Sequence, residues 1–116
     1  MPTLYETELE KYRAVRPPQV AGAQDRAWRA LLYIATSRPD LFQLVRPHMD
    51  YAAGTVDFDA LAGRLHAFDE QLVDAARSML EGDYAIRLHD LLSVDDSRIE
   101  VFIDAIRAYS YRTDRR

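Results

Sequence analysis

The side chains best suited to chemistry in this 116-residue sequence are three histidines and a scattered set of carboxylates. No two of the histidines, His48, His66 and His89, have the i, i+4 spacing at which two imidazoles on one helix bind zinc. Asp57 and Asp59 are i, i+2 neighbours, so on a helix their carboxylates point in different directions. We therefore predict that the histidines lie on the solvated surface and that the chain binds no metal.

The sequence motifs of nucleophilic and phosphate chemistry are missing. There is no cysteine, so a thiol nucleophile, a disulfide and cysteine-ligated zinc are excluded. There is also no Gly-x-Ser-x-Gly elbow and no glycine-rich phosphate loop. We therefore expect a protein that is not an enzyme and uses no cofactor, with a site assembled from distant residues as the alternative.

One stretch resembles part of a calcium-binding loop. Residues 54–61, with the sequence GTVDFDAL, are similar to the second half of an EF-hand loop, in which a glycine makes the bend. Aligned on Gly54, the last ligand position of such a loop holds Ala60 instead of a glutamate, and three earlier ligand positions hold Met49, Tyr51 and Ala53. Calcium takes about six to eight oxygen ligands, so we predict no calcium binding and expect a turn that leads into a capped helix.

Basic residues gather at the C-terminal end, where they could contact a nucleic acid. They are Arg107, Arg112, Arg115 and Arg116. Cations at the end of a helix also complement its dipole. A net charge of −4 and a pI near 5.3 are unlike the basic face of a general nucleic-acid binder. A helix-turn-helix over residues 69–92 would place acidic side chains against phosphates, so a nucleic-acid-associated regulator is an alternative and not our first prediction.

Tyrosine and arginine, which are favoured at protein interfaces, are frequent in this sequence. It contains 7 tyrosines, and all but Lys11 of its 15 basic residues are arginines. Tyr5, Leu9 and Tyr12 have the spacing of a single helix face, which we predict as the partner contact. Tyr109 and Tyr111, at the other end of the chain, are the second choice.

The elements that must position these residues are helices, and the central one contains the only tryptophan. Apolar residues between Ala27 and Ala35 recur at helical spacing, without the alternation of a strand. The apolar band widens beyond Ala30, as in a helix buried on several sides. We predict a helix over about residues 23–37, with Trp28 in a solid core. A small enzyme or ligand-binding protein with a pocket beside Trp28 is the second alternative function.

Capping residues and prolines predict the elements that precede and follow this central helix. Thr3 and Glu6 form a capping box for a helix that ends near Val15, before Pro17-Pro18. Residues 19–22 are expected to be a connector. A short helix begins at Pro39 and ends before Pro47, with an apolar face of Leu41, Phe42, Leu44 and Val45.

The second half of the chain is predicted to be helical too. Asp57 or Asp59 caps a helix that carries Phe58, Leu61, Leu65 and Phe68 on one face. Asp69 caps the next helix, which ends near Gly82 and buries Leu72, Val73, Ala76, Met79 and Leu80. Residues 84–92 fit either a helix or an extended segment. A last helix over about residues 95–111 buries Ile99, Phe102, Ile103, Ile106 and Tyr109.

These observations predict one all-α domain over residues 1–116, a compact irregular or orthogonal bundle of about six helices with a very short β-hairpin near Gly54. The helices over 69–81 and 95–111 should pack on the central one, residues 1–16 should be separable and residues 112–116 frayed. We see no signal peptide and no membrane span, and the arginine bias is typical of a GC-rich bacterial genome. We expect a cytoplasmic bacterial interaction protein, either a homo-oligomer or an adaptor subunit of a larger assembly.

Overall fold

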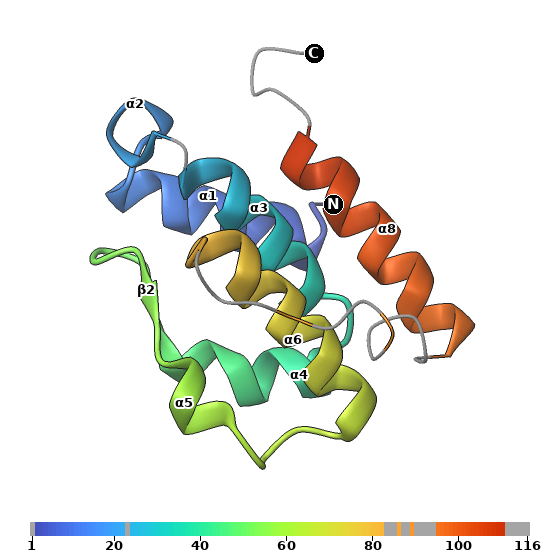
Figure 1. The fold of residues 1–116 in the computed structure, drawn as a ribbon. Coiled ribbons are helices and arrows are strands. Elements are labelled where there is room, and N and C mark those ends of the chain that lie inside the picture. Colours follow the sequence, from blue (N-terminus) through green and yellow to red (C-terminus); the bar gives the residue numbers. More distant parts are fainter. Residues whose placement is uncertain (1, 23, 83–85, 87–88, 90–94, 111–116) are drawn as a thin grey trace.

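Residues 2–22, 24–82, 86, 89 and 95–110 are described by the computed structural model of this chain, and they form an array of helices with one hairpin (Figure 1). The elements, in chain order, are α1 (Leu4–Val15), α2 (Pro18–Ala21), α3 (Gln24–Ala35), α4 (Pro39–Val45), the 3-10 helix η1 (Arg46–His48), β1 (Met49–Asp50), β2 (Thr55–Val56), α5 (Phe58–Leu61), α6 (Ala67–Leu80) and α8 (Asp96–Ser110). The predicted all-α fold with a very short hairpin near Gly54 is confirmed.

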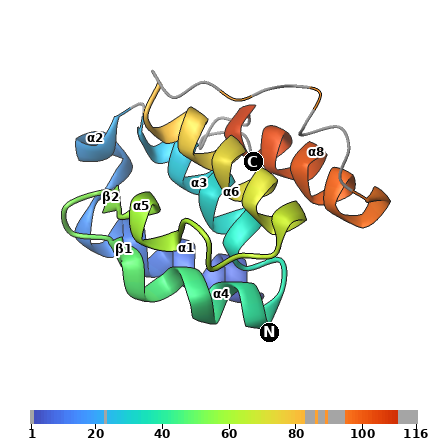
Figure 2. The ribbon, with the colours of Figure 1, turned by 60° about the horizontal axis from the view of Figure 1, so that its bottom comes forward.

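Helix α3 is the centre of the molecule, as its apolar pattern predicted. It packs against α1, α6 and α8, which surround it in both views (Figures 1 and 2). Trp28 is 0% exposed, and the residues around it on α3 are buried as well. Trp28 therefore lies in a solid core, because packed side chains and not solvent surround the indole.

An aromatic cluster of Tyr12, Trp28 and Tyr51 ties α1 and the hairpin to α3. The rings of Tyr12 and Trp28 stack with their centroids 4.7 Å apart, and Tyr51 meets them edge-on at 5.9 and 5.6 Å. The indole Nε1 also donates a hydrogen bond of 3.4 Å to the carbonyl of Gly54. Aromatic pairs of this kind contribute about 0.5–1.5 kcal/mol each beyond the area they bury.

The hairpin depends on Gly54. Strands β1 and β2 are antiparallel, with Met49 opposite Val56, and Gly54 in the turn has φ +70°. The positive φ favours glycine at this position, and a Cβ atom there would also stand 2.7 Å from Nε of Arg16, so a larger residue would have to displace that side chain. The predicted turn at Gly54 is confirmed.

Several predicted helix boundaries are confirmed because they depend on local capping. Thr3 and Glu6 form both bonds of the capping box at the start of α1. Pro39 opens α4, and the Asp57 carboxylate accepts a bond of 3.1 Å from the Ala60 N–H to cap α5. In the region predicted to be a connector, by contrast, α2 forms a single helical turn, since Pro18 suits the first position of a helix.

The helix predicted from Asp57 through Phe68 is wrong in its length. α5 ends at Leu61, and the chain turns at Gly63, whose φ of +81° is a left-handed conformation. Leu65 lies in the connection that follows, and Phe68 belongs to α6. The four apolar residues therefore do not share one helix face.

Asp69 is not the cap of α6, contrary to the prediction. His66 is the N-cap, and its Nδ1 accepts a hydrogen bond of 3.2 Å from the Phe68 N–H. Asp69 lies in the first turn of the helix and is buried, where two arginines bond it. The apolar face predicted for this helix is confirmed: Leu72, Val73 and Ala76 are buried, and Met79 and Leu80 pack against the core.

The face of α8 predicted to be buried is partly wrong. Ala105 is the buried residue, and Val101, Phe102 and Tyr109 pack against the core, whereas Ile103 and Ile106 are 42% and 40% exposed. In α4, likewise, Leu44 is 44% exposed. Periodicity identifies apolar residues that share a helix face, but a helix with two such faces buries only the one that meets a neighbour.

Among the described helices, none is both long and apolar enough to cross a membrane. The segment over residues 84–92, whose sequence fits either a helix or an extended segment, falls outside the described residues except for Ile86 and His89.

Candidate functional site

The predicted contact face on α1 packs largely against other parts of the same chain. Tyr12 is 0% exposed inside the aromatic cluster, so it has no surface to offer a partner. Tyr5 is half-buried and meets the ring of Tyr33 edge-on at 5.4 Å, and Leu9 packs against the core. The helical spacing of these residues correctly indicated a shared apolar face, but α3 covers much of it. A partner contact through Tyr5 and Leu9 stays a prediction.

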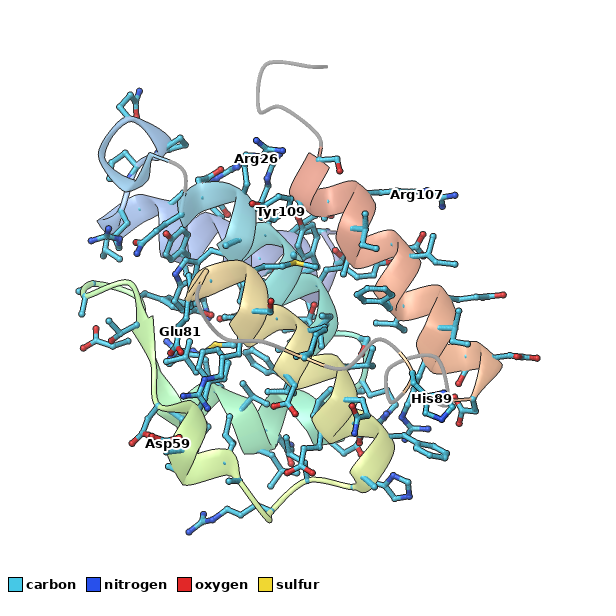
Figure 3. All side chains as sticks on the ribbon, viewed as in Figure 1. Arg26, Asp59, Glu81, His89, Arg107 and Tyr109 are labelled. Atoms are coloured by element: carbon cyan, nitrogen blue, oxygen red, sulfur yellow. The ribbon has the colours of Figure 1, made fainter. Side chains whose placement is uncertain are left out.

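At the other end of the chain, Tyr109 is held by α3. The Arg26 guanidinium lies 4.8 Å from the centre of the Tyr109 ring, and its Nε donates a hydrogen bond of 2.8 Å to the Tyr109 carbonyl (Figure 3). The other residues predicted here as partner or nucleic-acid contacts, apart from Arg107, are outside the described residues; they are Tyr111, Arg112, Arg115 and Arg116.

Arg107 is exposed and points away from α8 (Figure 3). Its Nη1 donates a hydrogen bond of 2.9 Å to Asp104, one turn earlier on the same helix. A phosphate that approached Arg107 would therefore also meet a carboxylate.

The outer side of α8 carries an apolar stripe that the core does not cover. Ile99, Ile103 and Ile106 follow one another at i, i+4 and i+7, so they form one row along the helix. Ile99 is half-buried, and the other two are the most exposed large apolar side chains of α8. Glu100 and Arg107 stand two turns apart along one edge of the row. We call Ile99, Ile103 and Ile106 the α8 isoleucine stripe.

A pocket of about 420 Å³ lies where α1, α3 and α8 meet, and we call it the three-helix pocket. It is lined by Tyr5, Arg29, Tyr33, Asp104, Arg107 and Ala108. The Tyr33 hydroxyl donates a hydrogen bond of 3.2 Å to Asp104, which joins α3 to α8 across the pocket. Burial raises the pKa of both tyrosines and lowers the pKa of the Arg29 guanidinium. This pocket was not foreseen, because its walls come from helices distant in the sequence.

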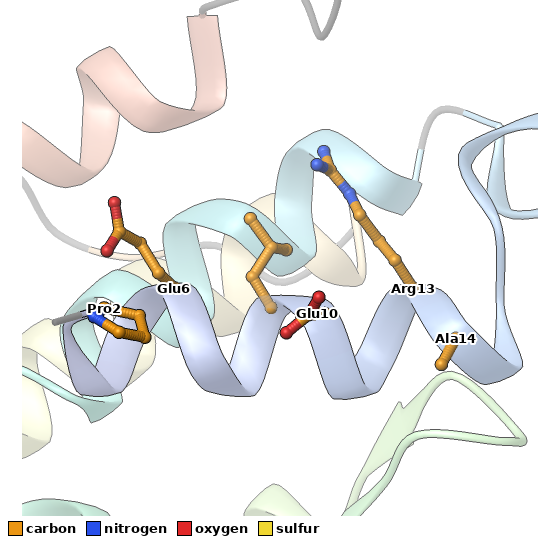
Figure 4. A pocket seen from close by; sticks show the side chains of 6 residues that line it. Pro2, Glu6, Glu10, Arg13 and Ala14 are labelled. Atoms are coloured by element: carbon orange, nitrogen blue, oxygen red, sulfur yellow. The ribbon is translucent and has the colours of Figure 1, made fainter.

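A hollow of about 610 Å³ along α1 is larger but less suited to binding (Figure 4). The lining residues that the structure describes all belong to α1 or precede it: Pro2, Glu6, Leu9, Glu10, Arg13 and Ala14. Those described residues offer one helix face, and a single face buries little of a ligand, whereas small-molecule sites enclose most of theirs.

Two buried carboxylates have structural roles. The Glu8 carboxylate in α1 accepts a hydrogen bond of 2.7 Å from the Tyr51 hydroxyl, and the Arg46 guanidinium lies 4.0 Å from the Tyr51 ring centre. The Asp69 carboxylate is bonded by Arg38 and Arg98. Because each carboxylate is paired with groups from other elements, these networks join α1 to the hairpin and α6 to α8.

Within the described parts of the chain, no three histidine or acidic side chains come close enough to hold a metal ion. His66 caps α6, and Asp57, in the stretch that resembles an EF-hand, caps α5.

No family model matches this chain, and the comparisons with curated proteins and with solved structures found no match.

Proposed function

We propose that this chain is a non-enzymatic interaction protein that forms a homodimer through the α8 isoleucine stripe. The observation that carries the proposal is the exposure of Ile103 and Ile106, at 42% and 40%, on a helix whose other apolar face already packs on α3. A row of aliphatic side chains left open to water along a helix is typical of a helix–helix interface.

The charges beside the stripe favour a second copy of the chain as the partner. In a twofold pair of antiparallel α8 helices, the same edge of each stripe lies on the same side of the interface. Glu100 of one copy then faces Arg107 of the other, and the pair occurs twice. The bond of Arg107 to Asp104 does not prevent this, because both side chains are solvent-exposed and such pairs contribute only about 0–1 kcal/mol.

The expected affinity is modest. An interface built on one helix face buries less than the roughly 1,600 Å² of a standard protein–protein interface. We therefore expect a reversible dimer with a dissociation constant on the order of 10 μM.

Sedimentation velocity over a concentration series through the micromolar range tests the proposal. The wild-type chain should shift from monomer to dimer, and Ile103→Glu should weaken dimerisation by about tenfold or more, since it places a charge in the apolar row. Leu44→Glu is the matched control, because Leu44 is equally exposed but lies on α4.

The proposal is wrong if the wild-type chain stays monomeric through the whole series. It is also wrong if Leu44→Glu weakens the dimer as much as Ile103→Glu, because the contact would then not be specific to α8.

A further inference from the structure

A second hollow shares the side chains of Tyr5 and Tyr33 with the three-helix pocket. Its volume of about 460 Å³ is within the range of roughly 300–1,000 Å³ that is usual for small-molecule sites. Its walls come from the start of α1, from the end of α3 with the residues that follow it, and from α8; they include Leu4, Tyr5, Tyr33, Thr36, Ser37 and Val101. We call it the Tyr5–Tyr33 hollow. Because three parts of the chain surround it, it can enclose more of a ligand than a single helix face can.

One side of the Tyr5–Tyr33 hollow suits an aromatic ring. The rings of Tyr5 and Tyr33 meet edge-on, with their centroids 5.4 Å apart and their planes at 68°. Leu4 is 38% exposed although it is a large apolar residue, and Val101 on α8 is half-buried. A flat apolar ring that packs on these side chains removes their surface from water and adds an aromatic contact.

The α3 side of the hollow offers hydrogen-bond acceptors. The Thr36 hydroxyl donates a hydrogen bond of 2.6 Å to the Leu32 carbonyl. The Ser37 hydroxyl likewise donates one of 2.6 Å to the Ile34 carbonyl. A hydroxyl has one proton and two lone pairs, so these two hydroxyls have no proton left for a ligand, but each can still accept a bond. They also follow the C-terminal end of α3, where the helix dipole is negative and favours a donor.

The lining of the hollow carries little charge. Of the lining residues that the structure describes, Glu6 alone is charged, and its exposed carboxylate accepts a hydrogen bond of 2.9 Å from the Thr3 N–H. Water and salt screen an exposed carboxylate, so it attracts a cation only weakly. An anion is disfavoured both by this carboxylate and by the negative end of α3. The hollow therefore favours a neutral ligand.

We infer that the Tyr5–Tyr33 hollow binds a small neutral aromatic molecule that carries one O–H or N–H donor, of the phenol or indole class. The ring packs on Leu4 and on the two tyrosine rings, and the donor bonds the hydroxyl oxygen of Thr36 or Ser37. A molecule of the same shape without the donor binds less well, because it leaves these oxygens facing a group that cannot bond them.

Three probes test this inference on the unmodified protein: phenol, fluorobenzene, which has nearly the same shape without a donor, and benzoate, which is an anion. Each is titrated at constant ionic strength while NMR follows the backbone amide signals of Leu4, Thr36 and Val101, which line this hollow and not the three-helix pocket. Phenol should bind saturably, with a dissociation constant on the order of 1 mM for so small a ligand. Fluorobenzene and benzoate should each bind about fivefold more weakly or worse.

Substitutions of the hydroxyls test the role of the donor. Thr36→Val/Ser37→Ala removes both hydroxyls with little change in shape, so it should weaken phenol binding by about fivefold or more and leave fluorobenzene binding unchanged. Ser110→Ala is the matched control, since the Ser110 hydroxyl also donates to a helix carbonyl, that of Ile106 at 2.9 Å, but does not line the hollow. It should bind phenol as the wild-type chain does.

A third variant tests the same site if the double variant does not fold. Val101→Phe fills the hollow from the α8 side without altering a hydroxyl or a charge, and it should abolish phenol binding. The result is separable from the proposed dimer, because Ile103 does not line the hollow and Ile103→Glu should bind phenol normally.

Four outcomes would overturn the inference. They are the absence of a saturable phenol shift, shifts confined to other parts of the chain, equal binding of phenol and fluorobenzene, and undiminished phenol binding by Val101→Phe or by Thr36→Val/Ser37→Ala.

Discussion

The Arg38 guanidinium, which precedes α4, donates two hydrogen bonds to the Asp69 carboxylate in α6, at 2.9 and 2.7 Å. Arg98 of α8 adds a bond of 2.7 Å from its Nε to the same carboxylate. Three segments distant in the sequence therefore meet at one buried anion. Arg38 above all, and then Arg98, holds the pKa of Asp69 down to about 2.

This arrangement predicts a loss of stability in acid. The pKa of Asp69 is lower in the folded chain than in the unfolded chain, so its stabilising effect is complete above about pH 4 and is lost as the pH falls toward 2. Asp69→Asn should lower the free energy of unfolding at neutral pH by about 3 kcal/mol, because it removes the buried negative charge that pairs with the guanidinium groups of Arg38 and Arg98. Urea denaturation at pH 7 and at pH 2.5 measures both effects, and the difference between wild type and variant should shrink at the lower pH.

The neighbouring Asp40 is the control for this experiment. It also bonds Arg38, at 3.1 Å, but it is exposed to solvent. Asp40→Asn should therefore change the denaturation curve little. An effect of Asp40→Asn as large as that of Asp69→Asn would show that burial of Asp69 is not the source of the stabilisation.

Tyr51 predicts a second pH dependence, at the alkaline end. Burial first, and then the hydrogen bond to Glu8, raises the pKa of the Tyr51 hydroxyl well above its usual value. A raised pKa in the folded chain means that this stabilisation is present below about pH 10 and is lost as the pH rises further. The unfolding free energy of wild type should fall above pH 10 more steeply than that of Tyr51→Phe, which has no hydroxyl to ionise.

At neutral pH, Tyr51→Phe should cost about 1–3 kcal/mol, since the buried Glu8 carboxylate loses a hydrogen bond. Tyr109→Phe is the control. Arg26 contacts the ring and the backbone carbonyl of Tyr109, and the substitution removes neither of them. Equal pH dependence of wild type and Tyr51→Phe above pH 10 would contradict the assignment.

Gly54 and Gly63 separate two effects of a glycine substitution. Both have positive φ, +70° and +81°, but a Cβ at Gly54 would meet Arg16 at 2.7 Å, whereas nothing lies within 4 Å of one at Gly63. Gly63→Ala should cost about 1 kcal/mol from backbone strain, and Gly54→Ala about 2–3 kcal/mol from strain and collision together. Thermal or urea denaturation measures the difference, and equal losses would mean that Arg16 moves aside at no cost.

The boundaries that could be predicted from the sequence depend on few neighbouring residues. The Thr3 capping box and the Asp57 cap use side chains that bond backbone groups within one turn. Gly54 occupies a turn position with a positive φ, which glycine adopts without strain. His66 could also have been foreseen as a cap in this sense, but histidine is a less usual N-cap than the Asp69 that follows it.

What could not be predicted depends on which helices become neighbours. α8 has apolar residues on more than half of its circumference, and only its packing on α3 decides that Ala105 is buried while Ile103 is not. Arg29 and Asp104 meet at one pocket although they are far apart in the chain, and no short motif encodes that proximity.

The proposed dimer makes one more prediction, which tests its orientation. If α8 pairs with itself in an antiparallel arrangement, Glu100→Arg places two arginines opposite each other at both ends of the interface, and Arg107→Glu does the same with two glutamates. Each single variant should weaken dimerisation by about five- to tenfold, measured by sedimentation velocity at low salt, where charge effects are strongest. The double variant Glu100→Arg/Arg107→Glu exchanges the two charges and should restore the wild-type dissociation constant. A double variant as weak as either single one would exclude this antiparallel pairing, because the charges would then act independently of each other.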